Sequence, residues 1–429
     1  MDNKLLINRA KEFEKEYFPC AKEWWCIEVL FTTKEDNKKW TLRGDFYQAI
    51  GHKRPVFSVY SASLFDLDEK KTYFNNYFNP VKLDTKKDKF EIKFEDAYIK
   101  GAYPDYETYI FVPAKDIHLN LKYHAESLPY WVAQQSTNGW LPWIFGYYRY
   151  GFIPNNKVEG TLKIHGKKFA LKGHGYFEHI FGDFSFIKEN KTQKSFKKTI
   201  SIYTSLIGNW IRKQRFQIPR SIMFGTDNRA PGYDWLWAVL DNNWSIFFGN
   251  MMLWIMEGPT TGTLILTKDG INYEEFSDIY FRYNKMKYLK EYDFYYPLEL
   301  EIIAKKGNEL LHFKCKNITD GFEDITKLKK VVRFGFTICQ VPIKLEGYYK
   351  KGDEKIDIKS FAKMEFHRTV RASGHNTLKL SVDIAKNSFG FYSRLDSHIF
   401  RKKADITLRL LPKPNFKVNL NKIDLSKLK

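Results

Sequence analysis

Residues 158–182 read VEGTLKIHGKKFALKGHGYFEHIFG, and residues 345–365 repeat their pattern as LEGYYKKGDEKIDIKSFAKME. At an offset of 187, without a gap, apolar and acidic positions stay in phase over about 21 residues, and Glu178 meets Glu365. Each copy has a turn of Gly, Asp or Lys residues between two short alternating segments, which is the pattern of a β-hairpin. The chain therefore uses one hairpin twice, and such a repeat predicts a duplicated domain.

A second, looser repeat lies upstream of each hairpin. Residues 23–29 (EWWCIEV) are similar to residues 234–240 (DWLWAVL) at an offset of 211, and each segment opens a strand with an acid and a tryptophan. Other short segments, such as residues 90–94 and 378–384, alternate apolar and polar side chains between turn residues. Many short strands at close spacing predict a barrel or a sandwich, so the sequence favours a mainly β protein with two related halves.

The length of 429 residues exceeds the size at which one hydrophobic core usually stops growing, so two domains are expected. Aromatic residues make up 17% of the chain, a share that suits strands and large apolar pockets better than helical bundles. Residues 5–18 predict a short opening helix, and the stretch from about 190 to 219 predicts a partly helical linker. The expected domains are residues 1–200 and 201–429.

The formal net charge of +20 at pH 7 would attract phosphate groups or an anionic bilayer. Because the lysines are scattered among acidic residues along the whole chain, the charge favours an ordinary solvated surface and disfavours nucleic acid as a partner. The basic linker could make peripheral contact with an anionic membrane. An ordinary packed connector is the favoured alternative.

Neither the amino-terminal sequence nor the spacing of the cysteines indicates a secreted protein. The amino terminus lacks an apolar signal region, and no window reaches roughly 18 uninterrupted apolar residues, so neither secretion nor membrane spanning is expected. The cysteines show neither CxxC spacing nor a nearby histidine pair, so neither a zinc site nor a disulfide framework is predicted; they are Cys20, Cys26, Cys315 and Cys339. A cytoplasmic location is the expectation, with peripheral membrane contact left open.

Three motifs follow one another along the chain: residues 23–25 (EWW), residues 173–182 (GHGYFEHIFG) and residues 232–235 (GYDW). Together they resemble the lipocalin-like hydratase family, which includes carotenoid 1,2-hydratase (hydroxyneurosporene synthase), with tocopherol cyclase and fungal Diels-Alderases as more distant relatives. The family's central hairpin reads G-x-x-x-x-[DE]-H-x-W-G. The chain departs from it at Phe181, where the family usually places Trp, and Glu178 stands where the hydratases often carry Asp.

The resemblance implies two lipocalin-like antiparallel β-barrels of the calycin type, arising from an internal duplication. It also implies a hydrophobic small molecule as partner, elongated and isoprenoid-like or polyene-like, and acid chemistry on carbon–carbon double bonds without a metal or organic cofactor. Hydratase, isomerase and cyclase reactions all fit this description. The alternative is a non-catalytic carrier of lipid or isoprenoid, because one barrel shape can host carriers and enzymes alike.

Protonating an isolated double bond needs a positioned acid and aromatic faces that tolerate a carbocation. Glu178 meets the first need if burial keeps its carboxyl protonated. Adjacent strand residues point to opposite faces, so either Tyr176 and Glu178 face the barrel interior, or His179 faces it with Phe177 and Phe181. Both arrangements are open, as is a structural role in which Glu178 pairs with a nearby Arg or Lys.

The candidate catalytic residues are therefore Glu178, His179 and Tyr176. Aromatic residues that crowd the two halves are the candidate ligand contacts, with ordinary core packing as the alternative for each; they are Trp24, Trp25, Trp140, Trp143, Tyr147, Tyr148, Trp235 and Trp237. Glu23 and Asp234 are further acids at strand starts, where capping a turn is the simpler role. Phosphate-loop, dinucleotide, serine-hydrolase and zinc-protease motifs do not occur.

Overall fold

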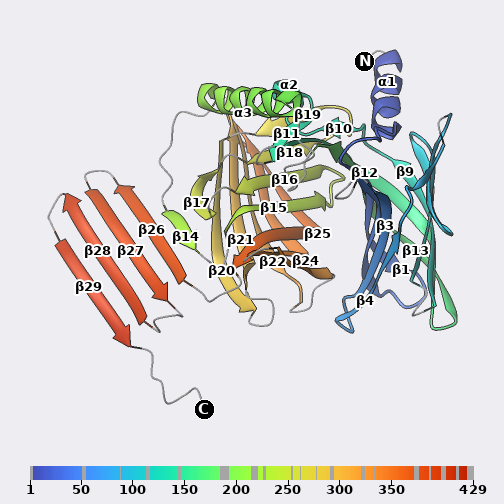
Figure 1. Cartoon of the computed structure of the whole chain (residues 1–429). Helices are drawn as coiled ribbons and strands as arrows, with labels where there is room; N and C mark the ends of the chain where they lie inside the picture. Colours follow the sequence, from blue (N-terminus) through green and yellow to red (C-terminus); the bar gives the residue numbers. More distant parts are fainter. Residues whose placement is uncertain are drawn as a thin grey trace.

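A computed structural model shows a chain built almost entirely of antiparallel sheet, with 70% of residues in strands and 9% in helices, which confirms the mainly β prediction. Two barrel domains form, one a half-barrel and the other nearly closed (Figure 1). The structure describes residues 3–50, 55–86, 88–112, 116–143, 146–183, 193–213, 221–225, 229–252, 255–260, 262–276, 278–289, 294–319, 324–331, 334–371, 376–385, 388–397, 402–411 and 415–422.

The first barrel is one antiparallel sheet. Its strands are β1 (Lys22–Thr33), β2 (Lys39–Ile50), β3 (Val56–Asp66), β4 (Lys71–Asn79), β5 (Asp84–Thr85), β6 (Phe90–Phe94), β7 (Ala97–Ala102), β8 (Asp105–Val112), β9 (Ile117–Ala125), β10 (Tyr130–Trp131), β11 (Trp140–Trp143), β12 (Gly146–Ile164) and β13 (Lys167–Gly182). Along the sheet they run β4-β3-β2-β1-β13-β12-β9-β8-β7-β6-β5, and β10 and β11 pair with β12.

The second sheet forms the other barrel and continues beyond it. Its strands are β14 (Ser221–Gly225), β15 (Arg229–Val239), β16 (Ser245–Met252), β17 (Ile255–Thr260), β18 (Thr263–Thr267), β19 (Tyr273–Phe276), β20 (Asp278–Leu289), β21 (Phe294–Lys306), β22 (Glu309–Asn317), β23 (Asp324–Val331), β24 (Phe334–Lys351), β25 (Glu354–Arg371), β26 (Asn376–Ala385), β27 (Ser388–Ser397), β28 (Lys402–Leu411) and β29 (Asn415–Lys422). They run β19-β18-β16-β15-β25-β24-β22-β21-β20-β17-β14-β26-β27-β28-β29, and β23 pairs with β24.

The two sheets share one strand plan, which confirms the predicted duplication. The order β3-β2-β1-β13-β12-β9-β8-β7 in the first matches β18-β16-β15-β25-β24-β22-β21-β20 in the second. The repeated hairpin is β12–β13 and β24–β25, with one register: Val158 pairs with Gly173, and Leu345 pairs with Ser360. The four strands β26–β29 extend the second sheet beyond this plan and have no counterpart in the described part of the first (Figure 1).

The upstream repeat needs a correction of two residues. Cys26 on β1 pairs with Glu178, whereas Trp235 on β15 pairs with Glu365, so the structural offset between these strands is 209 and not 211. The offset of 211 aligned Trp24 with Trp235 because both are tryptophans. Their pairing partners on the repeated hairpin are not equivalent, since Trp24 pairs with Ile180 and Trp235 with Glu365. Because the two offsets differ by two residues, an even number, each residue keeps its face of the strand, and the strand assignment is unaffected.

Gly160 and Gly347 occupy the same repeat position, and each marks a close approach between strands. A Cβ atom at Gly160 would lie 2.0 Å from the carbonyl oxygen of Asn120 on β9, and one at Gly347 would lie 2.1 Å from that of His312 on β22. We expect Gly160→Ala to lower the free energy of unfolding by about 1–3 kcal/mol, measured by chemical denaturation. Gly166→Ala is the control, because nothing lies within 4 Å there and only a positive φ opposes the change. Equal losses in both variants would contradict this explanation.

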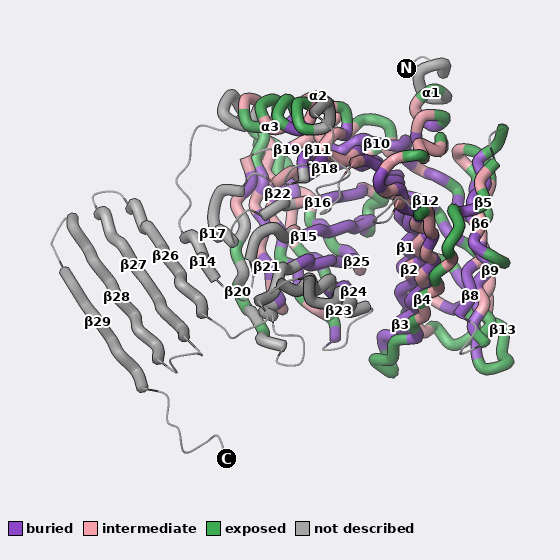
Figure 2. Tube along the Cα trace, viewed as in Figure 1, coloured by how far each residue is buried: buried purple, intermediate pink, exposed green. Residues whose placement is uncertain are grey.

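Figure 2 colours the buried positions of the trace purple. Among the described residues, buried apolar side chains form three hydrophobic clusters. One fills the first barrel with large side chains such as Trp25, Phe46 and Phe177, and a second fills the other barrel. The third lies between the barrels and combines residues of both, including Tyr176 from β13 and Trp237 from β15. This last cluster holds the two barrels together.

The helices α1 (Asn3–Glu14), α2 (Gln134–Thr137) and α3 (Gln193–Lys213) lie along one edge of the molecule (Figure 1). α1 places the fully buried Phe13 ring in the first barrel, where its centroid lies 5.2 Å from the centroid of the Phe177 ring. α3 joins the two sheets, so the boundary predicted at residue 200 falls inside it. Among the described residues, no helix combines the length and the apolar character needed to cross a bilayer.

Candidate functional site

Strand β13 presents its two faces to different environments, which decides between the two arrangements that the sequence left open. Phe177 and Phe181 belong to the core of the first barrel, and His179 between them is fully buried there. Tyr176 and Ile180 belong to the cluster between the barrels. Strand alternation therefore places Glu178 on the outside of the first barrel, facing the second.

His179 is a link between the first barrel and α1. Its Nδ1 donates to the carbonyl oxygen of Phe13 at 2.6 Å, and its Nε2 lies 2.9 Å from Glu23 Oε1. The two ring nitrogens of His179 therefore connect the backbone of α1 to the Glu23 carboxyl on β1. Glu23 also accepts from the backbone amide of Tyr17, and the imidazole stacks on Trp25 with 4.6 Å between centroids. The catalytic role of His179 stays a prediction, whereas its contacts are those of a structural link.

Glu178 is half-buried and held by neutral groups. Trp24 Nε1 donates to its Oε1 at 3.3 Å, and the Tyr150 hydroxyl donates to its Oε2 at 2.9 Å. Tyr150 in turn accepts from Trp235 Nε1 at 2.8 Å and lies 2.8 Å from the Tyr176 hydroxyl. Because the Tyr150 proton points to Glu178, Tyr176 donates to Tyr150, and the three groups form a chain that ends at the carboxyl.

The pKa of Glu178 is raised to about 7, chiefly because burial disfavours the charged carboxylate. The hydrogen bond from Tyr150 and the charge of Arg43 lower the pKa, while the nearby Glu365 and Asp45 raise it. A carboxyl with this pKa is about half protonated at neutral pH. Such a group can give or take a proton under ordinary conditions.

Glu365 comes from the repeat position of Glu178, but its surroundings differ. Arg43 Nη1 lies 3.2 Å from its Oε2, and it accepts hydrogen bonds from Tyr233 and Gln340. Arg43 is itself fixed by Asp45 at 2.8 Å. An arginine and two further donors therefore hold Glu365, whereas the hydrogen bonds described for Glu178 come from neutral donors. We call this group the inter-barrel site; it consists of Trp24, Arg43, Asp45, Tyr150, Tyr176, Glu178, Tyr233, Trp235 and Glu365.

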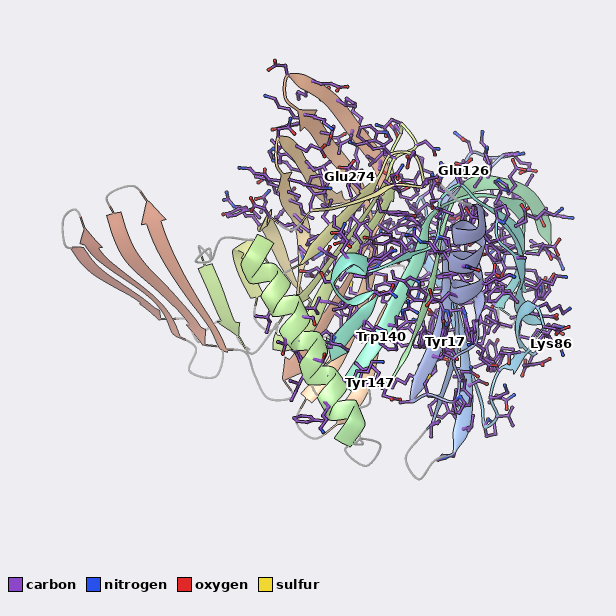
Figure 3. All side chains as sticks on the ribbon, turned by 90° about the horizontal axis from the view of Figure 1, so that it is seen from above. Tyr17, Lys86, Glu126, Trp140, Tyr147 and Glu274 are labelled. Atoms are coloured by element: carbon purple, nitrogen blue, oxygen red, sulfur yellow. The ribbon has the colours of Figure 1, made fainter. Side chains whose placement is uncertain are left out.

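The predicted ligand contacts divide between several environments. Those in or against the cluster between the barrels are Trp24, Tyr148, Trp235 and Trp237. Trp25 lies in the core of the first barrel. Trp140 and Tyr147 pack beneath α3, where Lys198 Nζ lies 3.3 Å and 4.3 Å from their ring centroids (Figure 3). The Trp143 side chain lies outside the described residues.

Sequence reasoning missed Arg43, Asp45 and Tyr233 as members of the site. Arg43 and Asp45 stand at alternate positions of β2, in the segment TLRGDFY (residues 41–47), where the flanking side chains are mostly apolar or aromatic. Two charges on one face of such a strand would have been a signal. No sequence signal distinguished Tyr233, because Tyr is common in strands.

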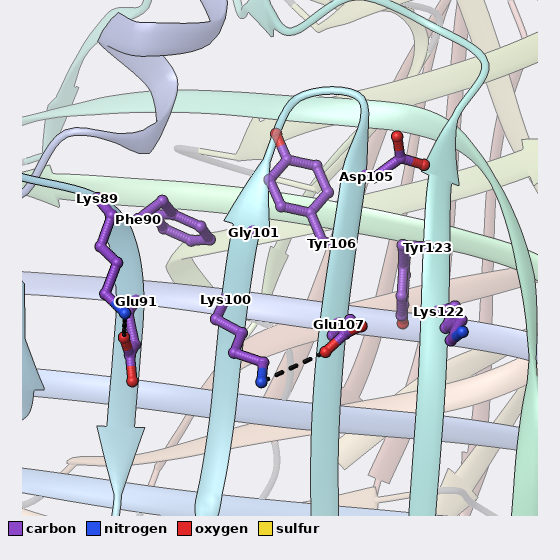
Figure 4. A pocket seen from close by; sticks show the side chains of 10 residues that line it. All are labelled: Lys89, Phe90, Glu91, Lys100, Gly101, Asp105, Tyr106, Glu107, Lys122 and Tyr123. Carbon is purple, nitrogen blue, oxygen red and sulfur yellow. Dashed lines mark ion pairs between the residues drawn. The ribbon is translucent and has the colours of Figure 1, made fainter.

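Two of the pockets in the part of the chain that the structure describes bear on the site. A groove of about 450 Å³ lies between the barrels, with Leu30 and His174 on one wall and Leu240 and Phe361 on the other. His174 precedes Glu178 by four strand residues, or about 13 Å. A second pocket of about 510 Å³ lies over strands of the first barrel; Figure 4 shows it lined by charged side chains, among which Lys100 pairs with Glu107. The groove between the barrels mixes apolar side chains such as Leu30 and Phe361 with charged ones, including Lys172 and Asp241.

Groups that ligate metals are not gathered in the described part of the chain: no three His, Cys, Asp or Glu side chains converge there. The four cysteines are free. Cys26 pairs with Glu178 across β1 and β13 and is buried, and burial raises the pKa of its thiol well above the ordinary value. A thiol of this kind is a poor nucleophile.

Comparison with protein-family models finds no match for the chain, and comparison with curated proteins finds none either. Solved structures share its fold. A protein provisionally assigned as AttH from Nitrosomonas europaea aligns with a TM-score of 0.55 and 13% identity, over 82% of this chain and 93% of that one. Kievitone hydratase from Nectria haematococca aligns with a TM-score of 0.51 and 14% identity, over 82% and 89%. These likenesses support the predicted fold of two lipocalin-like barrels, and none singles out carotenoid 1,2-hydratase.

Proposed function

We propose that this chain is an enzyme that binds an elongated apolar molecule between its barrels and performs acid-assisted chemistry on a carbon–carbon double bond. The observation that carries the proposal is Glu178, a half-buried carboxyl with a pKa of about 7 that faces the second barrel among aromatic rings. The fold shared with a protein named as a hydratase supports the same reaction class.

The proposed step begins with the protonated Glu178 carboxyl, which transfers its proton to one alkene carbon. The other carbon becomes cationic and is stabilised by the faces of Trp24, Trp235 and the neighbouring tyrosines. Water then adds to the cation and returns a proton to the Glu178 carboxylate, which gives net hydration. Loss of a neighbouring substrate proton to the carboxylate would instead give isomerisation. Attack by a second double bond closes a ring and forms a new cation, which loses a proton to the carboxylate and gives cyclisation.

A non-catalytic carrier is the second candidate, and one observation favours it. Glu365, at the repeat position of Glu178, is held by Arg43, Tyr233 and Gln340 as a structural acid would be. In a carrier, every buried acid is expected to be satisfied in this manner. Glu178 differs because its hydrogen bonds come from neutral groups and its pKa is near neutrality.

The pH dependence of turnover tests the proposal. Ligand extracted from the purified protein by organic solvent and identified by mass spectrometry would supply the substrate class, and related polyenes would be assayed between pH 5.5 and 8.5. Because the pKa of Glu178 is raised to about 7, its protonated fraction is high below that pH and falls above it. We expect turnover limited by proton donation to fall about tenfold per pH unit above 7. A retained ligand without turnover at any pH would establish the carrier.

A further inference from the structure

Helix α3 carries an apolar stripe on its outer surface. Phe196, Ile200 and Ile207 are exposed by 49%, 49% and 52%, and their spacing of four and seven residues places them on one face of the helix. Exposed large apolar side chains scattered singly are ordinary, but three in one stripe along one helix mark an interaction surface.

The inner face of α3 is already occupied. Thr199 and Ile202 are buried, and Lys198 Nζ lies over the Trp140 and Tyr147 rings. Figure 3 shows these two aromatic residues beside the helix. The helix contacts β11 and β12 with this face. Because that face is held against the first barrel, rotating the helix to bury its outer stripe would expose these inner contacts.

The charge on α3 is of one sign. Its sequence, QKSFKKTISIYTSLIGNWIRK, contains five Lys or Arg residues and no Asp or Glu. The whole chain carries a net charge of +20. An apolar stripe beside the exposed Lys197, on a basic helix too polar to cross a bilayer, matches a helix lying in the plane of an anionic membrane surface.

We infer that α3 docks this protein on an anionic lipid surface, with Phe196, Ile200 and Ile207 in the acyl boundary and Lys197 among the headgroups. This goes beyond the proposed function and does not depend on it. Anionic headgroups repel acidic side chains, so a helix that binds them should contain none. A protein partner imposes no such requirement.

α3 also lies close to one end of the inter-barrel site. The pKa of Tyr148, which packs against the cluster between the barrels, is raised by burial, by Glu178 and by Tyr203 of α3. The Tyr203 side chain is therefore near Tyr148. A membrane bound at the outer stripe would bring an apolar molecule in the bilayer close to that site.

Vesicle flotation with the full chain tests the inference. The probes are vesicles of phosphatidylcholine alone and of phosphatidylcholine with about one third phosphatidylglycerol, at about 0.1 M and 0.5 M salt. We expect binding to the anionic vesicles that weakens with salt. The triple variant F196S/I200S/I207S should lose roughly 100-fold in partitioning, and Lys197→Glu roughly tenfold.

The matched control is F74S/F78S, which removes two apolar side chains exposed by 45% and 67% on the edge strand β4 and should leave binding unchanged. Equal thermal unfolding of all variants shows that they are folded. Three results would overturn the inference: binding that is independent of lipid charge, an equal loss of binding in the control variant, or no binding to either kind of vesicle. A dimer in solution that dissociates in the triple variant would also overturn it, because a second copy would then cover the stripe.

Discussion

Replacing Lys363 with Met is expected to lower the free energy of unfolding by about 3–5 kcal/mol. Lys363 Nζ on β25 lies 2.5 Å from Glu28 Oε2 on β1, and the two side chains are only 0% and 4% exposed. The pair joins the two barrels through their interface. Loss of the ammonium group removes the cation that lies against the buried Glu28 carboxylate, and breaking a buried ion pair is among the larger destabilising effects of a single substitution.

Urea denaturation of three variants separates this effect from simple loss of packing. Lys363→Met and Glu28→Met should each be strongly destabilised, whereas the double variant should recover most of the loss, because no charge is then left unpaired. Lys100→Met is the exposed control. Its ion pair with Glu107 at 3.3 Å is 42% and 53% exposed, and its removal should change stability by less than about 1 kcal/mol. Losses of the same size for Lys100→Met and Lys363→Met would refute the explanation.

The sequence contained enough information to predict the fold because the duplicated hairpin preserves its register. Val158 and Leu345 lie on the first strands of the two hairpins. In both hairpins the turn between the strands has the same length, so an ungapped comparison detects the repeat. The opening helix was also recognised, because its apolar residues recur at helical spacing. The partly helical linker was recognised because the alternation typical of strands breaks there. The strands β26–β29 were not distinguished from the second barrel, since alternation alone does not show where a sheet stops curling.

The orientation of Glu178 was beyond sequence reasoning. On β13 the face with Tyr176 and Ile180 is as apolar as the face with Phe177 and Phe181, because one face packs inside the barrel and the other packs against the second barrel. Alternation distinguishes core from solvent, and here both faces are covered. The ion pair of Arg43 with Glu365 joins residues 322 positions apart, and no local sequence pattern predicts such a contact.

Replacing Glu178 with Gln should lower the turnover number by about 10²–10⁴-fold once a substrate is known, because the amide keeps the shape of the side chain but has no acidic proton. Glu14→Gln is the matched control. Glu14 is also half-buried with its pKa raised by burial, and it accepts a hydrogen bond from the Tyr106 hydroxyl at 2.9 Å, but it lies on α1. Turnover in that variant should stay within about twofold of the unaltered protein, as expected for a group outside the site.

The pH dependence of stability shows whether Glu178→Gln remains folded and whether the carboxyl is in fact poised near neutrality. A carboxyl whose pKa is raised in the folded state favours folding at low pH, and this contribution is lost as the pH rises through about 7, where the group must ionise while partly buried. The amide never ionises. Glu178→Gln should therefore gain thermal stability relative to the unaltered protein at pH 8 but not at pH 5. A gain that is independent of pH would mean that Glu178 is already charged at pH 5, and a carboxyl in that state could not donate the proton that the proposed reaction needs.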